Sequence, residues 1–404
     1  MKSMPLSDRT AVQVPRISVL LFVFGALCLD LNLPRLGSLK IGNLVMVASM
    51  LLSIGLLAYK NAWRLPFPSI RSSNRILLVY LGLIAASTLW APSAMDTLYQ
   101  CVLLIVIYAA SVFLASAPIE RVVRSIVVFA CIAAVLSLAV IPADRALAFQ
   151  PFTSGERPEL RGVFEHQLRL GLYMGLALGL VVLAALNGDL RRIFPQRWWL
   201  YLCLPLIFAA FVLAYARLYS FFVVVALALT IAFALGRWMR WIAGICTLAV
   251  VVVAITIQSS LESTLAGAGV DTSLTGRTTI WLRSIGEAAL TPLKGHGFAS
   301  FDQPAFDHLW PGVYRPPHPH NSFIQAFFEN GYLGFGLVVL LALSHIWVAG
   351  ARNPDQRYSY TFFFVLTMVL GSLTGANYAS KPVTLYCLVL LMTSIAIQTR
   401  NKSK

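Results

Sequence analysis

Residues 317–322, with the sequence PHPHNS, end a polar loop and open an apolar run that continues to Gly350. That run is long enough to cross a bilayer as a helix, so His320 is expected at the mouth of a membrane-spanning helix. Gly331 and Gly334 follow within the run. At helical spacing they place small residues on nearly one face, which predicts the close approach of another helix there.

The composition is that of a membrane protein. Hydrophobic residues make up 58% of the 404 residues and charged residues 12%, far outside the range of soluble globular proteins. The 6 cysteines all lie in apolar runs, where we expect core packing and neither disulfides nor zinc clusters. The net charge of +15 is spread between apolar runs, so it reflects topology, and no nucleic acid is expected as a partner.

Apolar runs of roughly 20 residues predict an all-α integral membrane protein with about twelve transmembrane helices. The runs lie near residues 17–33, 41–59, 76–92, 97–115, 122–142, 168–186, 199–216, 218–236, 240–258, 322–349, 359–377 and 383–399. The basic segment 1–16 indicates a cytoplasmic start and an uncleaved anchor. Most Lys and Arg residues then fall in short cytoplasmic loops and the two tails, which predicts an N-in/C-in topology. We expect one membrane domain over residues 1–404, with a large periplasmic loop of short helices, 258–320, between helices 9 and 10.

The other basic residues lie on the external side, where they oppose the orientation signal and therefore favour another use. Arg217 sits in a short turn between two apolar helices, which holds it at the membrane surface. A snorkelling helix-end arginine is the alternative interpretation. Arg161, Lys381 and Arg315 lie on the same side. We expect these basic groups to face one site.

A short helix is predicted in the external loop, ending just before Pro292. Arg277, Trp281 and Ser284 share one face of this helix, whereas Arg283 points away. We therefore expect Arg277 to face the site and Arg283 to be solvated or to contact lipid headgroups. The apolar residues of the helix indicate that it lies on the membrane or over the site.

Several chemistries lack the residues that they need. The external acids are scattered without an Asp-x-Asp pair, and we interpret Asp302 and Asp307 as solvated loop residues. A zinc site of the loop histidines His296, His308, His318 and His320 stays open as an alternative, but no carboxylate or cysteine stands at ligand spacing beside the last two. No metal and no cofactor are therefore expected.

A histidine surrounded by arginines remains. Arginine donates two parallel hydrogen bonds to phosphate oxygens and keeps its charge, which suits a diphosphate. A neutral histidine can accept a proton from a hydroxyl, and nearby arginines favour the neutral form. This combination fits a glycosyl transfer in which a sugar hydroxyl attacks and a diphosphate leaves. The expected site consists of the general base His320, the diphosphate ligands Arg161, Arg217 and Arg277, and the substrate contacts Asn321, His318, Lys381 and Arg315. A helix-capping histidine without chemistry is the alternative for His320.

These residues resemble a known family, the bacterial O-antigen ligases with the related O-antigen polymerases and O-linked oligosaccharyltransferases. His320-Asn321, then nine residues, Gly331, two residues and Gly334 resemble the family signature H-[NSQ]-x9-G-x-x-G. A further small residue expected three positions after the second glycine is replaced by Leu337.

Weaker matches accompany the signature. GR at 276–277 with Trp281, and PL and GHGF within 292–298, resemble the stretch that opens the family's large periplasmic loop. RGVF at 161–164 with His166 resembles another family stretch, although the common Pro-Asn is replaced by QL. Arg217 falls where relatives carry Ser-Arg-Ser, but its neighbours here are Ala and Leu.

The resemblance implies a C-type glycosyltransferase (GT-C) architecture in the bacterial inner membrane, with the active site facing the periplasm and no need for a nucleotide sugar or metal. The implied partners are undecaprenyl-diphosphate-linked O-antigen as the donor, lipid A-core oligosaccharide as the acceptor, and membrane lipids. A polymerase would instead extend a second lipid-linked repeat unit, and an oligosaccharyltransferase would modify a protein hydroxyl. The modest chain length favours the ligase. Direct displacement by the acceptor predicts inversion at the donor sugar.

A transporter or flippase of the same polyprenyl-diphosphate glycans is the alternative from another class. In that case the arginines bind the diphosphate and His320 relays protons. Transporters usually show repeat halves and broken helices that carry mid-membrane charges. Here the unusual charges gather at one face, which favours the enzyme.

Overall fold

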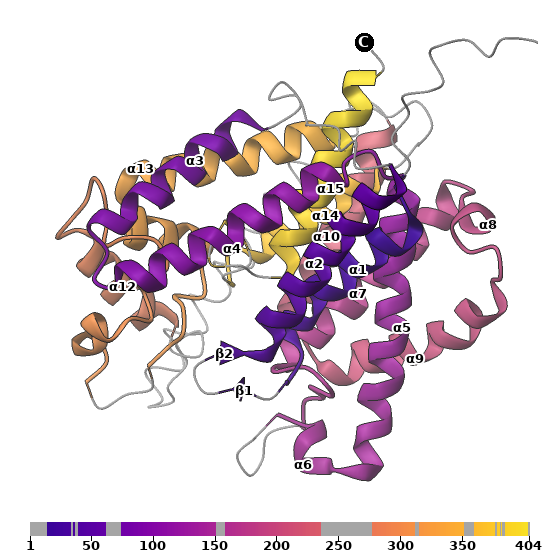
Figure 1. The fold of residues 1–404 in the computed structure, drawn as a ribbon. Helices are drawn as coiled ribbons and strands as arrows, with labels where there is room; N and C mark the ends of the chain where they lie inside the picture. The colour runs from indigo at the N-terminus through magenta and orange to yellow at the C-terminus, as the bar shows by residue number, and fades with distance from the viewer. Residues whose placement is uncertain are drawn as a thin grey trace, which may run out of the picture.

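The computed structural model describes residues 14–33, 35–36, 39–61, 74–150, 158–235, 277–311, 315–350, 359–375, 378–379, 381 and 384–402. Helices dominate these residues (Figure 1). A two-residue hairpin pairs β1 (Arg35–Leu36) with β2 (Leu39–Lys40) in antiparallel register.

The helices follow the apolar runs of the sequence. They are α1 (Arg16–Leu27), α2 (Ile41–Lys60), α3 (Arg75–Ala86), α4 (Ala94–Phe113), α5 (Ile119–Ala143), α6 (Arg145–Ala148), α7 (Gln167–Leu186), α8 (Leu190–Ile193), α9 (Trp198–Ala214), α10 (Arg217–Leu235), α12 (Arg277–Ala288), α13 (Ser322–Ala349), α14 (Tyr360–Gly371) and α15 (Thr384–Lys402), with 3-10 turns at Cys28–Asp30, Ser87–Leu89 and Pro304–Leu309. Every predicted range overlaps a helix except 240–258, which lies outside the described residues. The loop helix, α12, ends close to its predicted position before Pro292.

Among the described helices, 6 are long and apolar enough to cross a membrane, namely α2, α4, α5, α7, α10 and α13. Shorter apolar helices occupy Arg75–Leu89, Trp198–Ala214, Tyr360–Gly371 and Leu385–Arg400. The described residues are thus almost entirely helical, and their several apolar helices indicate a multi-pass membrane protein. The count of about twelve spans, the GT-C architecture and the orientation of the termini stay predictions.

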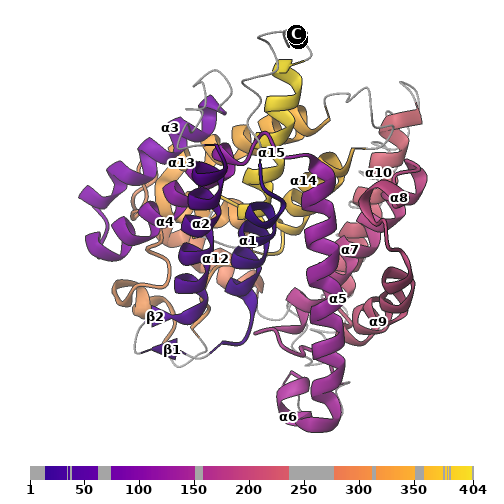
Figure 2. The same cartoon turned by 45° about the vertical axis from the view of Figure 1, so that its right-hand side comes forward.

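Helix α7 lies at the centre of the packing, and 72% of the residues in its most apolar stretch are buried. It contacts α5, α9, α10 and α14 (Figure 2). Gly175 and Gly179 permit this, because a side chain at Gly175 would meet Phe211 at 3.0 Å and Val223 at 3.1 Å, and one at Gly179 would meet the ring of Phe363. Small residues let membrane helices approach closely, and here they fix the helix whose first turn borders the candidate site.

Helix α13 is broken near its start. Asn330 has φ −133° and ψ 16°, and Gly331 has φ 61° and ψ −159°. The freed amides turn to the loop: Tyr332 N donates to Pro292 O at 2.8 Å. A side chain at Gly331 would collide with this same loop backbone. The prediction of a helix–helix contact at the signature glycines is therefore wrong. The backbone of the loop packs against Gly331 instead.

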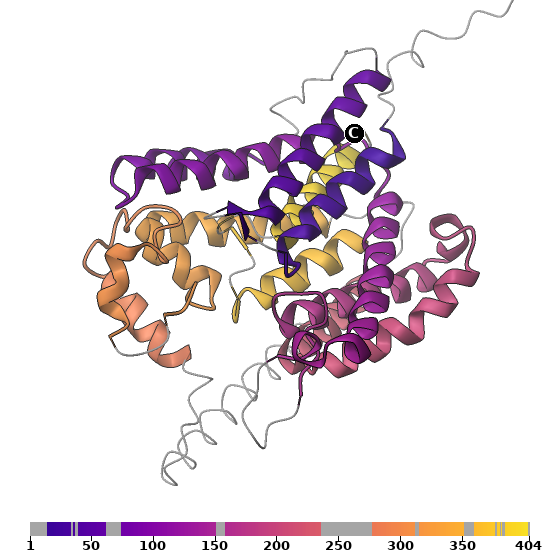
Figure 3. The same cartoon turned by 60° about the horizontal axis from the view of Figure 1, so that its bottom comes forward.

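Gly334 also permits the break in α13, because the side chain of Asn330 occupies the place that a side chain at residue 334 would need. The contact continues along the loop, where Gly297 N donates to Glu329 O at 2.7 Å and His296 N to Phe328 O at 3.0 Å. These bonds attach the segment 292–297 to the first turns of α13 (Figure 3). The loop segment 292–297 is therefore attached to the same helix that His320 precedes.

Candidate active site

His320 immediately precedes α13 in a left-handed backbone conformation, with φ 55°. The next residue, Asn321, caps the helix: its Oδ1 accepts hydrogen bonds from Phe323 N at 2.9 Å and Ile324 N at 3.1 Å. Asn321 Nδ2 donates to Leu373 O at 3.0 Å. The capping alternative for His320 is therefore wrong, and both ends of the Asn321 amide have structural partners.

The backbone at His320 is held in its strained conformation by its neighbours. Trp281 Nε1 donates to Pro319 O at 2.8 Å, which ties α12 to this turn. His320 N donates to Nδ1 of His318 at 3.2 Å, and the two rings lie 4.3 Å apart. A non-glycine residue with positive φ is uncommon, and such strain persists mainly where the surroundings impose it, often at functional sites.

A third histidine, His166, belongs to the same cluster. It caps α7, with Nδ1 accepting from Leu168 N at 3.2 Å. Burial lowers the pKa of His320 to about 4, helped by the charges of Arg277 and Arg169 and by His166. Burial likewise lowers the pKa of His166 to about 4, helped by Arg169, Arg277 and Arg161.

The pKa of His318 lies well below its ordinary value, because of burial first and then His320, Arg169, Lys381 and Arg277. All three rings are therefore neutral at pH 7. A neutral imidazole can accept a proton, and the positive charges around it attract an anion.

Arg277 is the first residue of α12, and its charge acts on His166, His318 and His320. Ser284 and Ala288, which share its helix face, are buried. Burial lowers the pKa of Arg277, while Tyr219 raises it, and a guanidinium stays charged throughout the working pH range. Within the described residues no carboxylate forms an ion pair with Arg277.

The other two predicted diphosphate ligands have different surroundings. Arg161 donates through Nε to Leu147 O at 2.9 Å and through Nη2 to Ala146 O at 3.3 Å, so it fastens the chain before α7. Its charge acts on His166. Arg217 is the exposed first residue of α10, and its guanidinium lies 4.3 Å from the ring centroid of Tyr215. Arg217 is not among the charges that act on the three histidines, so its contact with a donor stays a prediction.

Lys381 and Arg315 are paired with acids of the loop. Lys381 forms an ion pair with Asp302. Arg315 lies 2.7 Å from Asp307 and also donates to the backbone oxygen of Asp302. Asp302 and Asp307 are 40% and 57% exposed, in line with the interpretation as solvated loop acids, and each also contacts a cation. Lys381 still contributes charge to the site through His318.

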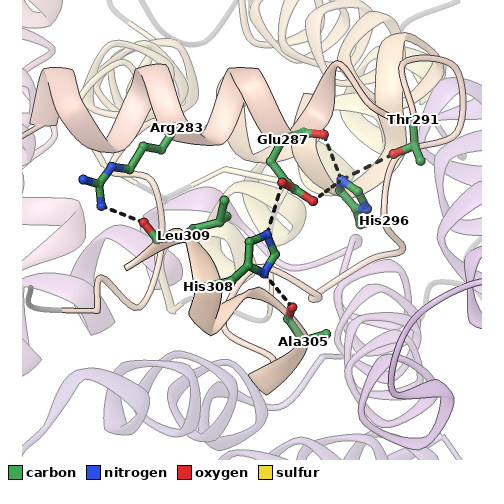
Figure 4. A network of polar contacts seen from close by, with 7 residues as sticks. All are labelled: Arg283, Glu287, Thr291, His296, Ala305, His308 and Leu309. Atoms are coloured by element: carbon green, nitrogen blue, oxygen red, sulfur yellow. Dashed lines mark hydrogen bonds and ion pairs between the residues drawn. The ribbon is translucent and has the colours of Figure 1, made fainter. Parts of the chain in front are cut away.

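Arg283 is only partly exposed and has partners within the loop, contrary to the prediction of a solvated or headgroup-contacting side chain. Its Nη1 donates to Leu309 O at 2.6 Å (Figure 4), and the guanidinium lies 5.9 Å from the ring centroid of Trp310. The residue points away from Arg277, as expected from the helical spacing, but it points into the folded loop. Its contacts are structural.

The remaining loop histidines form a separate network. Glu287 lies between His296, at 3.8 Å, and His308, at 3.4 Å (Figure 4). His296 is further enclosed by Phe306 and Phe328, with ring centroids 4.8 and 4.9 Å away. In the part of the chain that the structure describes, no three His, Cys, Asp or Glu side chains are arranged to hold a metal ion. The four loop histidines therefore separate into two pairs.

Arg169 is a site residue that the sequence pattern did not reveal. Together with Arg277 it is one of the two arginines whose charge acts on all three site histidines. Its Nε lies 3.6 Å from Oδ1 of Asp30. The spacing from His166 was an available signal, since a residue three positions after a helix cap lies in the same turn.

Comparison with known proteins finds similarity in the same part of the chain. Residues 202–339 match the family model described as O-Antigen ligase. A stretch of 102 residues is 31% identical to the exopolysaccharide production protein ExoQ of Rhizobium meliloti (strain 1021), covering 24% of this chain and 23% of that protein. The family match includes Arg217, Arg277 and His320 with both signature glycines. This match agrees with the resemblance drawn from the motifs: over residues 202–339 the chain is similar to the O-antigen ligase family, and it spans only about a quarter of the length of ExoQ.

Proposed function

We propose that the chain is an O-antigen ligase that transfers a glycan from undecaprenyl diphosphate to a sugar hydroxyl of lipid A-core. The proposal places the site at the periplasmic face of the inner membrane, in a GT-C, N-in/C-in architecture formed by residues 1–404. The observation that carries it is the neutral His320 beside the positive charge of Arg277 at the mouth of α13. That pairing supplies a proton acceptor and an anion ligand in one place.

In the proposed reaction, His320 accepts the proton of the acceptor hydroxyl as its oxygen attacks the anomeric carbon of the donor. The bond from that carbon to the diphosphate breaks, and the diphosphate leaves with the electron pair. Arg277 stabilises the charge that develops on the departing oxygen, which lowers the barrier more than it strengthens ground-state binding. One displacement inverts the anomeric configuration, and no divalent ion is required.

A polymerase is the second candidate, because a quarter of the chain resembles a protein named for exopolysaccharide production. It would use the same donor and the same base, and only the acceptor would differ. Purified protein incubated with lipid-linked donor and either lipid A-core or a second lipid-linked repeat separates the two, since the products differ in their lipid. Transfer to lipid A-core supports the ligase, and longer lipid-linked glycans without such transfer support the polymerase.

His320→Ala tests the base in the same assay. The change should lower the transfer rate by ~10² to ~10⁴, the usual contribution of a general base, while donor binding is retained. Near-normal turnover by folded His320→Ala protein would remove the observation on which the proposal rests.

A further inference from the structure

Two distant parts of the chain meet beside the histidine cluster. The residues that follow α1 run antiparallel to those that precede α7, with a bridge between Leu31 and Phe164. Asn32 N donates to Val163 O at 2.9 Å, and Glu165 N donates to Asp30 O at 3.1 Å. This pairing delivers the carboxylate of Asp30 to the first turn of α7.

Two side chains of α7 hold that carboxylate. Arg169 Nε lies 3.6 Å from Oδ1 of Asp30, and the hydroxyl of Tyr173, one turn further along α7, donates to Oδ2 at 2.5 Å. The side chains of Arg169 and Asp30 are only 20% and 11% exposed. Withdrawing two charges from water is costly, and a pair of this kind often stabilises a fold no better than apolar residues would. Stability is therefore a weak explanation for this pair.

The position of Arg169 supplies another explanation. The backbone N–H of Arg169 donates to His166 O at 3.0 Å, so Arg169 lies in the same helical turn as one histidine of the site. Its charge acts on His166, His318 and His320 alike, as does that of Arg277. A diphosphate carries two phosphoryl groups, and two guanidinium forks from two elements, α7 and α12, suit it better than one.

We infer that Arg169 is a further ligand of the donor diphosphate and that Asp30, supported by Tyr173, orients its guanidinium. The inference rests on the proposed function, because it names a second ligand in the same site. Asp30 contacts the guanidinium through Nε, and it sets the direction of a fork that has five N–H donors in fixed geometry. Asp30 is thus a positioning residue, and Arg169 contacts the substrate.

The test measures binding of undecaprenyl diphosphate to purified full-length protein in detergent, with undecaprenyl monophosphate and phosphatidylglycerol as comparison probes. Arg169→Lys should weaken diphosphate binding ~10-fold to ~100-fold, the range expected for lost charge-assisted hydrogen bonds, and should affect the comparison probes less. Arg192→Lys is the matched control, because Arg192 pairs with Glu120 at 3.2 Å, away from the histidines. This control should bind like wild type.

A double variant separates ligand from scaffold. Removing Arg169 alone leaves Asp30 unpaired, which could unfold the protein, whereas Asp30→Asn with Arg169→Gln removes both charges together. We expect this double variant to melt near the wild-type temperature and still to bind the diphosphate poorly. Asp30→Asn alone keeps the charge of Arg169 and should lower kcat more than it raises KM, because the fork is present but misdirected.

Three outcomes overturn the inference: wild-type diphosphate affinity in the folded double variant, wild-type affinity in Arg169→Lys, or an equal loss for phosphatidylglycerol and for the diphosphate. Any of them leaves Arg169 as part of the scaffold or of a general anionic surface. The proposed function fails separately, when folded wild-type protein neither binds undecaprenyl diphosphate nor transfers its glycan.

Discussion

His320 is kept neutral by its surroundings, and the same surroundings set the pH range in which it can act as a base. Its pKa of about 4 results from burial and from Arg277, His166 and Arg169. A base is active when unprotonated, so activity should fall as the pH drops through this pKa. The anionic donor favours the protonated ring, so the acid limb of kcat should lie at higher pH than that of kcat/KM.

Arg277→Gln tests this coupling. It removes a positive charge, so the pKa of His320 rises and the acid limb of kcat/KM should move to higher pH. The measurement is a pH profile of transfer with folded protein, and Arg192→Gln serves as the control without a shift. An unchanged limb in Arg277→Gln would mean that His320 is not the titrating base.

The position of Arg217 is fixed by the short turn between α9 and α10. Tyr215 closes α9 with φ 51°, and Arg217 begins α10 two residues later with its guanidinium against the Tyr215 ring. Arg217→Lys keeps the charge but loses the two-pronged geometry, so the transfer rate should fall ~10-fold or more at saturating donor. Arg145→Lys, another exposed arginine on the same side by the predicted topology, should behave like wild type. Equal rates for the two variants would place the diphosphate away from Arg217.

At the residue scale, the sequence predicted the chemistry of the site but not the partners of its side chains. The effect of Arg277 on the pKa of His320 agrees with the prediction that external basic residues, which oppose the orientation signal, face one site. The hydrogen bond of Arg283 could not be predicted, because its partner Leu309 O lies across a loop whose fold has no sequence signal. Arg169 was missed because its ion-pair partner Asp30 lies in the first predicted run, whereas Arg169 lies in the sixth.

Among the elements, the break in α13 governs how the loop meets the membrane. At Gly331, the positive φ and the backbone of Pro292 and Leu293 leave no room for a side chain. Gly331→Ala should therefore destabilise the protein by ~1 to ~3 kcal/mol. It should also reduce transfer, because the loop that carries Arg277 could no longer pack against α13 at this point. Gly336→Ala is the control in the same helix, since nothing lies within 4 Å of an added side chain there.

Thermal unfolding and transfer rates of the two variants in one detergent check this prediction. A Gly331→Ala protein as stable and active as Gly336→Ala would mean that the break is dispensable. The two results together also decide whether the signature glycines serve backbone geometry or another function.

Helix positions followed from the sequence because a bilayer crossing requires a long apolar run, and such a run is a local property. The break in α13 could not be predicted in this way. Asn330 and Gly331 lie inside a continuous apolar run, and their conformation depends on a loop segment, 292–297, that reaches them only in the folded protein. The glycine pattern was visible, but helix–helix packing, the commonest role of such glycines in membrane helices, was the wrong one.

At the scale of the whole molecule, the candidate site draws on segments from most of the chain. The family match spans residues 202–339, yet His166 and Arg169 precede it and Lys381 follows it. The electrostatic conditions at the site thus depend on residues outside the matched segment. A fragment limited to residues 202–339 would keep Arg277 but lack Arg169 and Lys381, the other two cations that act on His318, and its histidines would titrate differently.

The distribution of acids across the molecule leads to a prediction about metal ions. Asp30, Asp302 and Asp307 each face a cation, and Glu287 lies between two histidines. A divalent ion that neutralises a diphosphate needs oxygen ligands, and these carboxylates already have partners. Arginine charge can stabilise the leaving group in its place. Transfer should therefore continue at an undiminished rate in excess EDTA, measured with metal-free donor and acceptor. Activity that disappears in EDTA and returns with magnesium or manganese would show that the ion is required and that the arginines alone do not neutralise the diphosphate.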